Sequence, residues 1–140
     1  VQHQFAFRAQ QEEEEITFTG EESVLLHCDR TWMREALGNL VKNALDHTAP
    51  GDHIRIQWTQ AASLLQIKVQ DNGSGIHPED LPHIFKRFYR SRFSQQTPGI
   101  GLGLPLAKAI VDAHGGTIEV DSTLHRGTTF TLNFRIPTKL

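Results

Sequence analysis

Two neighbouring segments of alternating hydrophobicity, residues 53–59 and 64–70, limit what this chain can fold into more than any other feature. In HIRIQWT and LLQIKVQ, hydrophobic and polar side chains alternate with a period of two, which is typical of strands with one buried face. Only the four residues QAAS separate the two segments, so we expect them to pair as an antiparallel hairpin. The hydrophobic face of this hairpin has to be covered by another layer of structure.

A long amphipathic helix, predicted from Thr31 to about His47, can supply that layer. Asp29 stands where a helix N-cap is expected, and Pro50 with Gly51 ends the pattern. The hydrophobic positions fall at i, i+4, i+7, i+8 and i+11, along one side of a helix: Met33, Leu37, Leu40, Val41 and Ala44.

Shorter elements complete the pattern on either side. Strands are predicted at Ile16–Phe18 and Val24–His27, with a second hairpin formed by TIEVDS and GTTFTLNFRI. A second helix is expected over LPLAKAIVDAH, two short helical pieces within HPEDLPHIFKRFYR with Pro78 at a first turn, and a mobile loop over SRFSQQTPGIGLG. This order predicts an α+β protein, a two-layer sandwich whose mixed, mostly antiparallel sheet is covered on one face by helices.

Composition excludes several function classes. The 140 residues are 38% hydrophobic, enough for one folded domain, and the net charge of −2 gives no basic field for nucleic acid. Cys28 is alone, so neither a disulfide framework nor a cysteine-rich zinc site is available. The sequence has no run of about 20 apolar residues and no signal-peptide pattern. We expect residues 1–15 to be a linker or the end of an upstream helix.

Polar residues form a second stripe on the long helix. Asn39, Asn43 and His47 recur every four residues, with Asp46 beside them. Asparagine is a poor residue for a helix interior, so two of them one turn apart need a reason. One reading is an ordinary solvent face, and the other is a site where amide oxygens bind a hard cation such as Mg²⁺.

The segment DNGSGI, residues 71–76, follows the second strand of the hairpin. An ordinary turn explains it, and so does a site where Asp71 accepts a hydrogen bond from the amine of a purine while glycines let the base approach. The acidic spacing of a calcium-binding EF-hand is missing.

The glycine-rich segment GIGLGL, residues 99–104, runs into the second predicted helix. Exposed N–H groups at a helix start favour phosphate. A Walker loop requires Gly-Lys-Ser/Thr where Leu104 and Pro105 stand, and the dinucleotide pattern requires a preceding strand, so the choice is another phosphate loop or a hinge. In IFKRFYRSRF, three aromatic residues have the spacing of a helical core face and three arginines suit either phosphate or solvent: Phe85, Phe88, Tyr89, Arg87, Arg90 and Arg92.

In this order, the segments resemble the motifs of the catalytic and ATP-binding domain of bacterial sensor histidine kinases, within the gyrase, Hsp90 and MutL superfamily. LGNLVKNALDHT resembles the N box, DNGSGI the G1 box, IFKRFY the F box, GIGLGL the G2 box, and GTTFTL the final glycine-threonine segment. The resemblance implies the Bergerat ATP-binding fold for residues 16–140, and Mg-ATP as the ligand.

The resemblance also implies residue roles. Asn43 is the expected Mg²⁺ ligand, Asn39 supports the metal or phosphates, and both are expected to be catalytic, with His47 near the phosphates. Asp71 is expected to read the adenine amine, with Gly73 and Gly75 making room for the base. The remaining nucleotide contacts that it implies are Ile76, Phe85, Arg87, Arg90, Gly99, Gly101, Leu102, Gly103, Leu104, Thr128 and Thr129.

The expected activity is transfer of the ATP γ-phosphate to a histidine, because related ATPases carry a glutamate base where Asn39 stands. None of the eight histidines has the sequence context of the family's acceptor. The implied partners are therefore a dimerisation domain elsewhere in the same protein and a downstream response regulator. The full protein is expected to be a membrane-anchored homodimer, with this part cytoplasmic and monomeric by itself.

Other functions also fit the motifs. An ATP-driven switch of the gyrase or Hsp90 type conflicts with Asn39, and a serine kinase of the anti-sigma-factor type has the same boxes. A nucleotide-binding regulatory module without transfer remains open, because Asp46 stands where many relatives have lysine or arginine.

Overall fold

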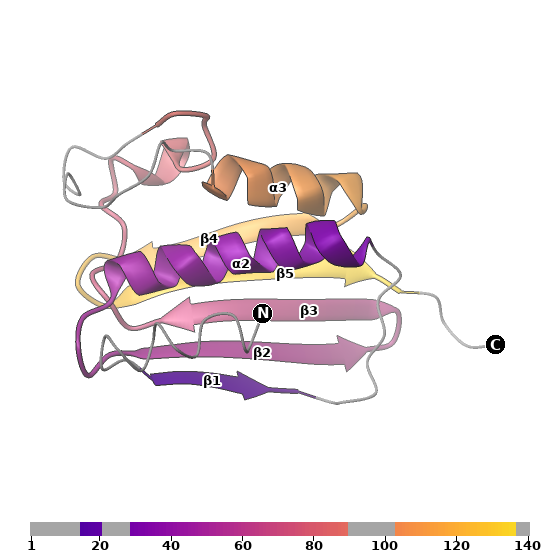
Figure 1. The fold of residues 1–140 in the computed structure, drawn as a ribbon, viewed down its shortest axis with the longest axis horizontal. Helices are drawn as coiled ribbons and strands as arrows, with labels where there is room; N and C mark the ends of the chain where they lie inside the picture. The colour runs from indigo at the N-terminus through magenta and orange to yellow at the C-terminus, as the bar shows by residue number, and fades with distance from the viewer. Residues whose placement is uncertain (1–14, 21–28, 90–102, 137–140) are drawn as a thin grey trace.

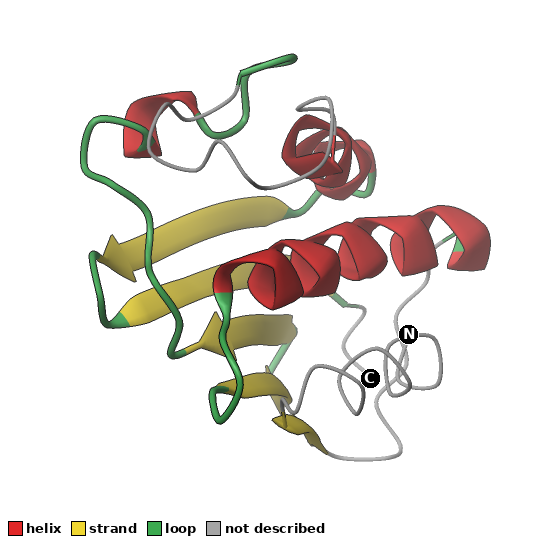
Figure 2. Ribbon diagram, turned by 60° about the vertical axis from the view of Figure 1, so that its left-hand side comes forward, coloured by secondary structure: helices red, strands yellow, loops and turns green. Residues whose placement is uncertain are grey.

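The protein is a two-layer sandwich in which helices cover one face of a β-sheet (Figures 1 and 2). A computed structural model describes residues 15–20, 29–89 and 103–136, without the side chains of residues 15–19 and Arg30. Within these ranges, no helix has both the length and the apolar character that crossing a membrane requires.

The described strands form one five-stranded sheet in the order β1-β2-β3-β5-β4. The strands are β1 (Glu15–Thr19), β2 (His53–Ala61), β3 (Leu64–Asp71), β4 (Thr117–Thr123) and β5 (Gly127–Arg135). β1 lies parallel to β2, and every other neighbouring pair is antiparallel. The predicted mixed, mostly antiparallel sheet is confirmed.

The predicted hairpin of β2 and β3 is confirmed, with a shorter turn than expected. Gln60 and Ala61 still pair with Leu65 and Leu64, so the connection is two residues long and not the four of QAAS. Ala62 has a φ of 54°, the left-handed conformation that two-residue hairpin turns favour.

Helix α2 (Arg30–His47) crosses the sheet and supplies most of the helical half of the core. Its predicted N-cap is confirmed, because the Asp29 carboxylate accepts a hydrogen bond from the N–H of Trp32 at 3.1 Å. Leu40 and Val41 are buried against the sheet, where Phe130 of β5 is 2% exposed. Helix α3 (Gly103–Ala113) packs beside α2 and buries Ala107, Ile110 and Val111.

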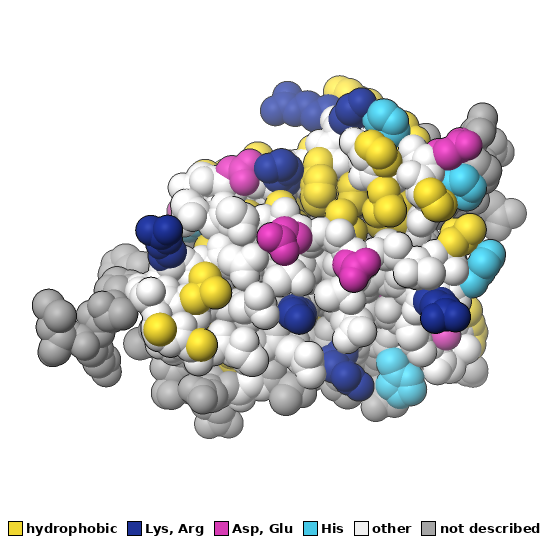
Figure 3. All heavy atoms as spheres, turned by 180° about the vertical axis from the view of Figure 1, so that it is seen from behind, with side chains coloured by type: hydrophobic (Ala, Val, Ile, Leu, Met, Phe, Trp, Pro, Cys, Tyr) yellow, Lys and Arg dark blue, Asp and Glu magenta, His cyan; other side chains and the backbone are white. Residues whose placement is uncertain are grey.

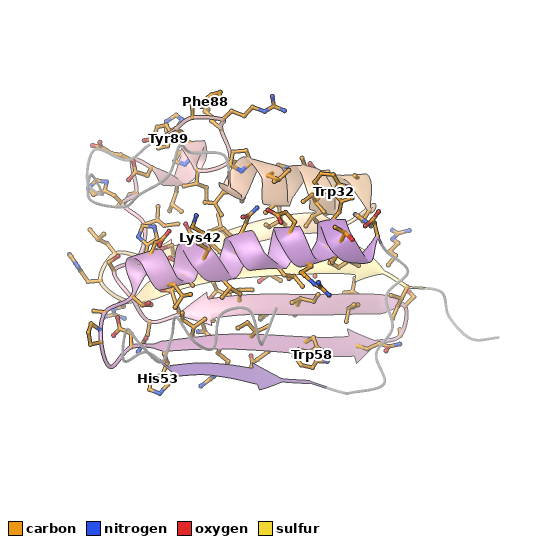
Figure 4. The ribbon with its side chains drawn as sticks, viewed as in Figure 1. Trp32, Lys42, His53, Trp58, Phe88 and Tyr89 are labelled. Atoms are coloured by element: carbon orange, nitrogen blue, oxygen red, sulfur yellow. The ribbon has the colours of Figure 1, made fainter. Side chains whose placement is uncertain are left out.

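The prediction for residues 77–90 is wrong in its local detail. One short 3-10 helix, η1 (Leu81–His83), replaces the two helical pieces, and Pro78 lies in a turn before it. The proposed aromatic core face does not form, because Phe88 has a φ of 64° and is 68% exposed at the tip of the turn (Figure 4). Tyr89 instead donates its hydroxyl proton to the buried carboxylate of Asp80, at 2.6 Å.

Three further predictions lie mostly or wholly outside the described residues: the linker or helix end at 1–15, of which only Glu15 is described and begins β1, the strand at Val24–His27, and the loop that was expected at 91–103. The face of the sheet opposite the helices carries mostly polar and charged side chains (Figure 3). Hydrophobic side chains gather toward the edge of that view where β4 and α3 lie.

Candidate functional site

Asp71, the last residue of β3, is the centre of the candidate site. It lies between β2 and β5, paired with Ile54 and Thr128, and is only 5% exposed. Its Oδ1 accepts a hydrogen bond from the N–H of Gly73 at 2.9 Å, and the N–H of Thr128 also donates to the carboxylate. Burial raises the pKa of Asp71, while the Gly73 N–H, the charge of His47 and the Thr128 N–H act in the opposite direction.

The turn after Asp71 is held between the end of α2 and the turn that joins β4 to β5. The N–H of Ser74 donates to the carbonyl of His47 at 2.9 Å, and the carbonyl of Ser74 accepts from the N–H of His125 at 2.7 Å. A Cβ atom at Gly73 would overlap with the His47 carbonyl, and one at Gly75 with the Thr123 carbonyl. Both glycines are thus required by packing within the protein, a reason that the sequence did not reveal.

Thr128 and Thr129, the two candidate threonines of GTTFTL, lie on opposite faces of the sheet. Thr128 is 3% exposed and shares the helical face with Phe130, beside Asp71. Thr129 follows it on the open face, where it pairs with Gln70 and Asp121. The structure therefore brings Thr128, and not Thr129, together with Asp71.

Ser122 of β4 is the residue of this region that the sequence reasoning missed. Its Oγ accepts a hydrogen bond from the N–H of Ile76 at 2.8 Å and lies 2.8 Å from Oγ1 of Thr128. The carbonyl of Gly127 lies 3.1 Å from the same hydroxyl and is a second acceptor within reach of its single proton. A serine in an edge strand gives no signal of such a role, because its partners lie on other strands and turns.

Asn39, Asn43 and His47 are half-buried along α2, so this stripe is not a plain solvent face. The Nδ2 of Asn39 is buried and has no hydrogen-bond partner among the described residues. The Asn39 side chain approaches the first residue of α3, at 3.8 Å from the position of a Cβ on Gly103. A buried donor without an acceptor is costly, so this atom is the clearest sign in the helix of an absent ligand.

The remaining described candidates lie in the core, at the start of α3, or in the turn after η1. Ile76 is buried in the core, and Phe85 packs edge-on against Phe130 with ring centroids 6.3 Å apart, so both have structural contacts. Leu104 packs against the core at the start of α3, and Arg87 is exposed in the turn before residue 90. Four candidates lie outside the described residues: Arg90, Gly99, Gly101 and Leu102.

The donor set of the described residues fits a weakly held cation. They contain no group of three or more His, Cys, Asp or Glu side chains that could hold a metal. Mg²⁺ takes oxygen ligands, and in nucleotide sites it is usually held by only one or two protein groups, most often carboxylates, together with substrate phosphates and water. The amide oxygen of Asn43 is a suitable protein ligand for that arrangement, whereas zinc and calcium sites need more protein ligands.

Comparison with known proteins places this arrangement in a family. Residues 28–139 match the model of the "Histidine kinase-, DNA gyrase B-, and HSP90-like ATPase" family. The chain is 38% identical over 123 residues to the sensor histidine kinase YvrG of Bacillus subtilis, covering 86% of the chain and 21% of YvrG. It is 42% identical over 120 residues to CusS of Escherichia coli O157:H7, covering 84% of the chain and 24% of CusS.

Solved structures agree with the described fold. The mycobacterial sensor histidine kinase MprB aligns with a TM-score of 0.85 at 24% identity, over 99% of this chain and 94% of that one. The catalytic domain of the histidine kinase ThkA gives 0.83 at 26%, over 96% and 89%. Full-length ShkA in complex with AMPPNP gives 0.79 at 25%, over 98% of this chain but 29% of ShkA.

Proposed function

This chain belongs to the family of histidine kinase-, DNA gyrase B- and HSP90-like ATPases, and from that premise we propose that it places Mg-ATP for phosphoryl transfer to a histidine outside the chain. It is an ATP-binding catalytic domain of the sensor-histidine-kinase type. The chain spans 21% to 24% of the length of the two sensor kinases to which it was compared, so the reaction of the whole protein is part of the proposal.

The buried carboxylate of Asp71 is the observation that carries the proposal. Two backbone N–H groups hold it at the end of a central strand, although burial disfavours its charged form. A fold retains such a group at a cost when the group has a use, and an ionised carboxylate is an acceptor for the exocyclic amine of adenine. Thr128 lies beside it and offers a hydroxyl to the same base.

The α2 stripe is assigned to the triphosphate. A phosphate oxygen would give the buried Nδ2 of Asn39 the acceptor that it lacks among the described residues. Asn43 would hold Mg²⁺, which when bound offsets the negative charge of the phosphates. His47 is proposed to lie near the phosphates. Thr129 is left out of the proposed site, because it lies on the open face of the sheet. The remaining predicted contacts keep their proposed role in nucleotide binding: Gly73, Gly75, Ile76, Phe85, Arg87, Arg90, Gly99, Gly101, Leu102, Gly103 and Leu104.

In the proposed reaction the γ-phosphoryl group is transferred to a histidine and not to water. The bond between the γ-phosphorus and the β–γ bridging oxygen breaks, ADP leaves, and a bond forms to an imidazole nitrogen whose proton passes to solvent. Asn39 cannot take a proton from water, so we expect the domain to hydrolyse ATP slowly. The proposal also includes two partners, a dimerisation domain of the same protein and a response regulator. It further includes a homodimeric assembly, a membrane anchor, and a domain boundary at residue 16, where the ATP-binding domain begins.

Calorimetric titration with a non-hydrolysable ATP analogue tests the nucleotide site. The chain should bind the analogue more tightly with Mg²⁺ than with EDTA. Asp71→Asn should weaken binding at least tenfold in both buffers, because the amide offers an N–H where an acceptor is needed. Asn43→Ala should instead remove most of the difference between the two buffers.

The matched control for the acidic site is Asp121→Asn, on the exposed open face of the sheet. It should bind like the original chain. Absence of binding by a folded chain would contradict the proposal. Binding without transfer to any supplied dimerisation domain would favour the regulatory module, and rapid ATP turnover by the chain alone would favour the ATPase-type switch.

A further inference from the structure

One hydroxyl group, that of Ser122, joins three segments around Asp71. It contacts the N–H of Ile76 in the turn after β3, the carbonyl of Gly127, and the hydroxyl of Thr128 at the start of β5. Thr128 in turn donates its backbone N–H to the Asp71 carboxylate. Ser122 therefore contacts the acid's neighbour Thr128, which does not neighbour Ser122 in sequence, and also holds the turn that follows Asp71.

The hydrogen bonds of this group can be counted. A serine hydroxyl has one proton and two lone pairs, and the N–H of Ile76 occupies one lone pair. The Ser122 proton goes either to the Gly127 carbonyl at 3.1 Å or to Thr128 Oγ1 at 2.8 Å. In the second arrangement Thr128 accepts from Ser122 and keeps its own proton for another partner.

The backbone leaves Thr128 little freedom to find another orientation. Gly127 has a φ of 120°, and a Cβ there would overlap with the carbonyl of Asp71, so the start of β5 is pressed against the end of β3. The hydroxyl of Thr128 can rotate, but its backbone cannot move away. The partner that Ser122 provides thus decides whether Thr128 presents a proton or a lone pair.

We propose that Ser122 is a positioning residue for nucleobase selection, which makes Thr128 a hydrogen-bond donor beside the acceptor Asp71. An acceptor next to a donor matches the amine and the ring N1 of a 6-aminopurine. It does not match the carbonyl and N1–H of a 6-oxopurine. This inference rests on the proposed function, because it assigns the base selectivity of the same nucleotide site.

The test compares the affinities of ATP and inosine triphosphate, which carries the 6-oxopurine, by calorimetry. The original chain should prefer ATP. Ser122→Ala should weaken ATP about fivefold, the equivalent of one ordinary hydrogen bond, and change inosine triphosphate less than twofold. A merely structural role of Ser122 would weaken both triphosphates by the same factor, and that result would overturn the inference.

Further variants remove the remaining ambiguities. Ser122→Thr keeps the hydroxyl and should keep the preference for ATP over inosine triphosphate. Ser122→Cys keeps the side-chain volume with a weaker donor and should reduce that preference. The cysteine variant therefore tests the inference even if Ser122→Ala fails to fold. Thr117→Val is the matched control: this exposed β4 threonine accepts a hydrogen bond from the Asn133 amide, and its substitution should leave the preference unchanged.

A double-mutant cycle locates the path of the effect. If Ser122 acts through Thr128, adding Ser122→Ala to Thr128→Val should cost no further selectivity, and additive losses would contradict this path. If the original chain binds ATP, but the Ser122 variants do not change its preference for ATP over inosine triphosphate, this inference fails and the proposed function stands. If the folded original chain binds neither triphosphate, the proposed function fails and this inference fails with it.

Discussion

At the scale of single residues, Asp71 lowers the stability of the folded chain when it is charged, because its carboxylate is buried. Its carboxylate is buried at the edge of the core, where burial raises its pKa from the ordinary value of 3.8. The Gly73 and Thr128 N–H groups offset only part of this effect. A neutral side chain of the same shape would fit the site at lower cost in the ligand-free protein.

The first prediction concerns the pH dependence of that cost. A folded-state pKa above the unfolded value means that the stability contribution of Asp71 is full below about pH 3.8 and is lost as the pH rises through the folded pKa. Asp71→Asn has no such loss. The free energy of unfolding of Asp71→Asn, relative to the original chain, should therefore increase from pH 4 to neutral pH, as measured by urea unfolding.

Other acidic groups titrate in both proteins, so their contributions cancel in that difference. A difference that stays constant between pH 4 and pH 7.5 would show that burial does not penalise the charged form of Asp71. The same series, repeated with the ATP analogue, should show the original chain losing affinity as Asp71 is protonated, because a protonated carboxyl is a poorer acceptor for the amine.

At the scale of elements, the site depends on where helix and strand ends meet. The carbonyl of His47, at the end of α2, accepts from Ser74 and lies where a Gly73 side chain would be. The same turn is held on its other side by the turn between β4 and β5. Three connections far apart in sequence therefore position Asp71.

The second prediction tests this junction. Gly73→Ala should lower the free energy of unfolding by about 2–3 kcal/mol, since the new methyl group displaces the end of α2 or the turn. Gly51→Ala is the control, because nothing lies within 4 Å of its Cβ position and only its φ of 91° is unfavourable. It should cost about 1 kcal/mol. Equal losses in urea titrations would exclude the overlap as the cause.

The third prediction concerns the start of α2. Asp29→Ala removes the side-chain acceptor of the Trp32 N–H and should cost about 1 kcal/mol. Asp29→Asn keeps a capping oxygen and should cost a few tenths of that. The backbone N–H of Asp29, which donates to Nε2 of His114 beyond α3, is present in both variants. Thermal unfolding should rank the original chain and Asp29→Asn above Asp29→Ala.

At the scale of the whole molecule, the core lies between the sheet and the pair of helices, and the loops add little to it. Phe130 of β5 is 2% exposed beneath the helices, whereas Phe88 is 68% exposed on the turn that follows η1. The two phenylalanines therefore differ in burial and not in chemistry, which makes them a matched pair.

The fourth prediction uses that pair. Phe130→Ala should cost about 3–5 kcal/mol, because it removes buried apolar surface and leaves a cavity in a domain of modest size. Phe88→Ala should change stability by no more than about 0.5 kcal/mol, since it removes a side chain that water already surrounds. Comparable midpoints of urea unfolding for the two variants would contradict the described core.

Much of the fold could be predicted because its elements have strong local patterns. The period of α2, its Asp29 cap and the alternation in β2 and β3 are properties of neighbouring residues, and the structure confirms them. The prediction of two short helical pieces within residues 77–90 is wrong, because Pro78 at a first turn and the aromatic spacing are local signals that do not report tertiary contacts. The left-handed Phe88 and the Tyr89–Asp80 hydrogen bond hold that segment in a turn.

The sequence by itself determined the α+β class, the order of helix and hairpins, and Asp71, Asn39 and Asn43 as candidates, since periodicity and residue chemistry act over a few neighbouring positions. Only the tertiary structure decided which threonine lies beside Asp71, why Gly73 has no side chain, and that Ser122 belongs to the site. It also left Nδ2 of Asn39 buried without an acceptor among the described residues. These outcomes depend on contacts between strands and turns far apart in the chain, and no local pattern contains them.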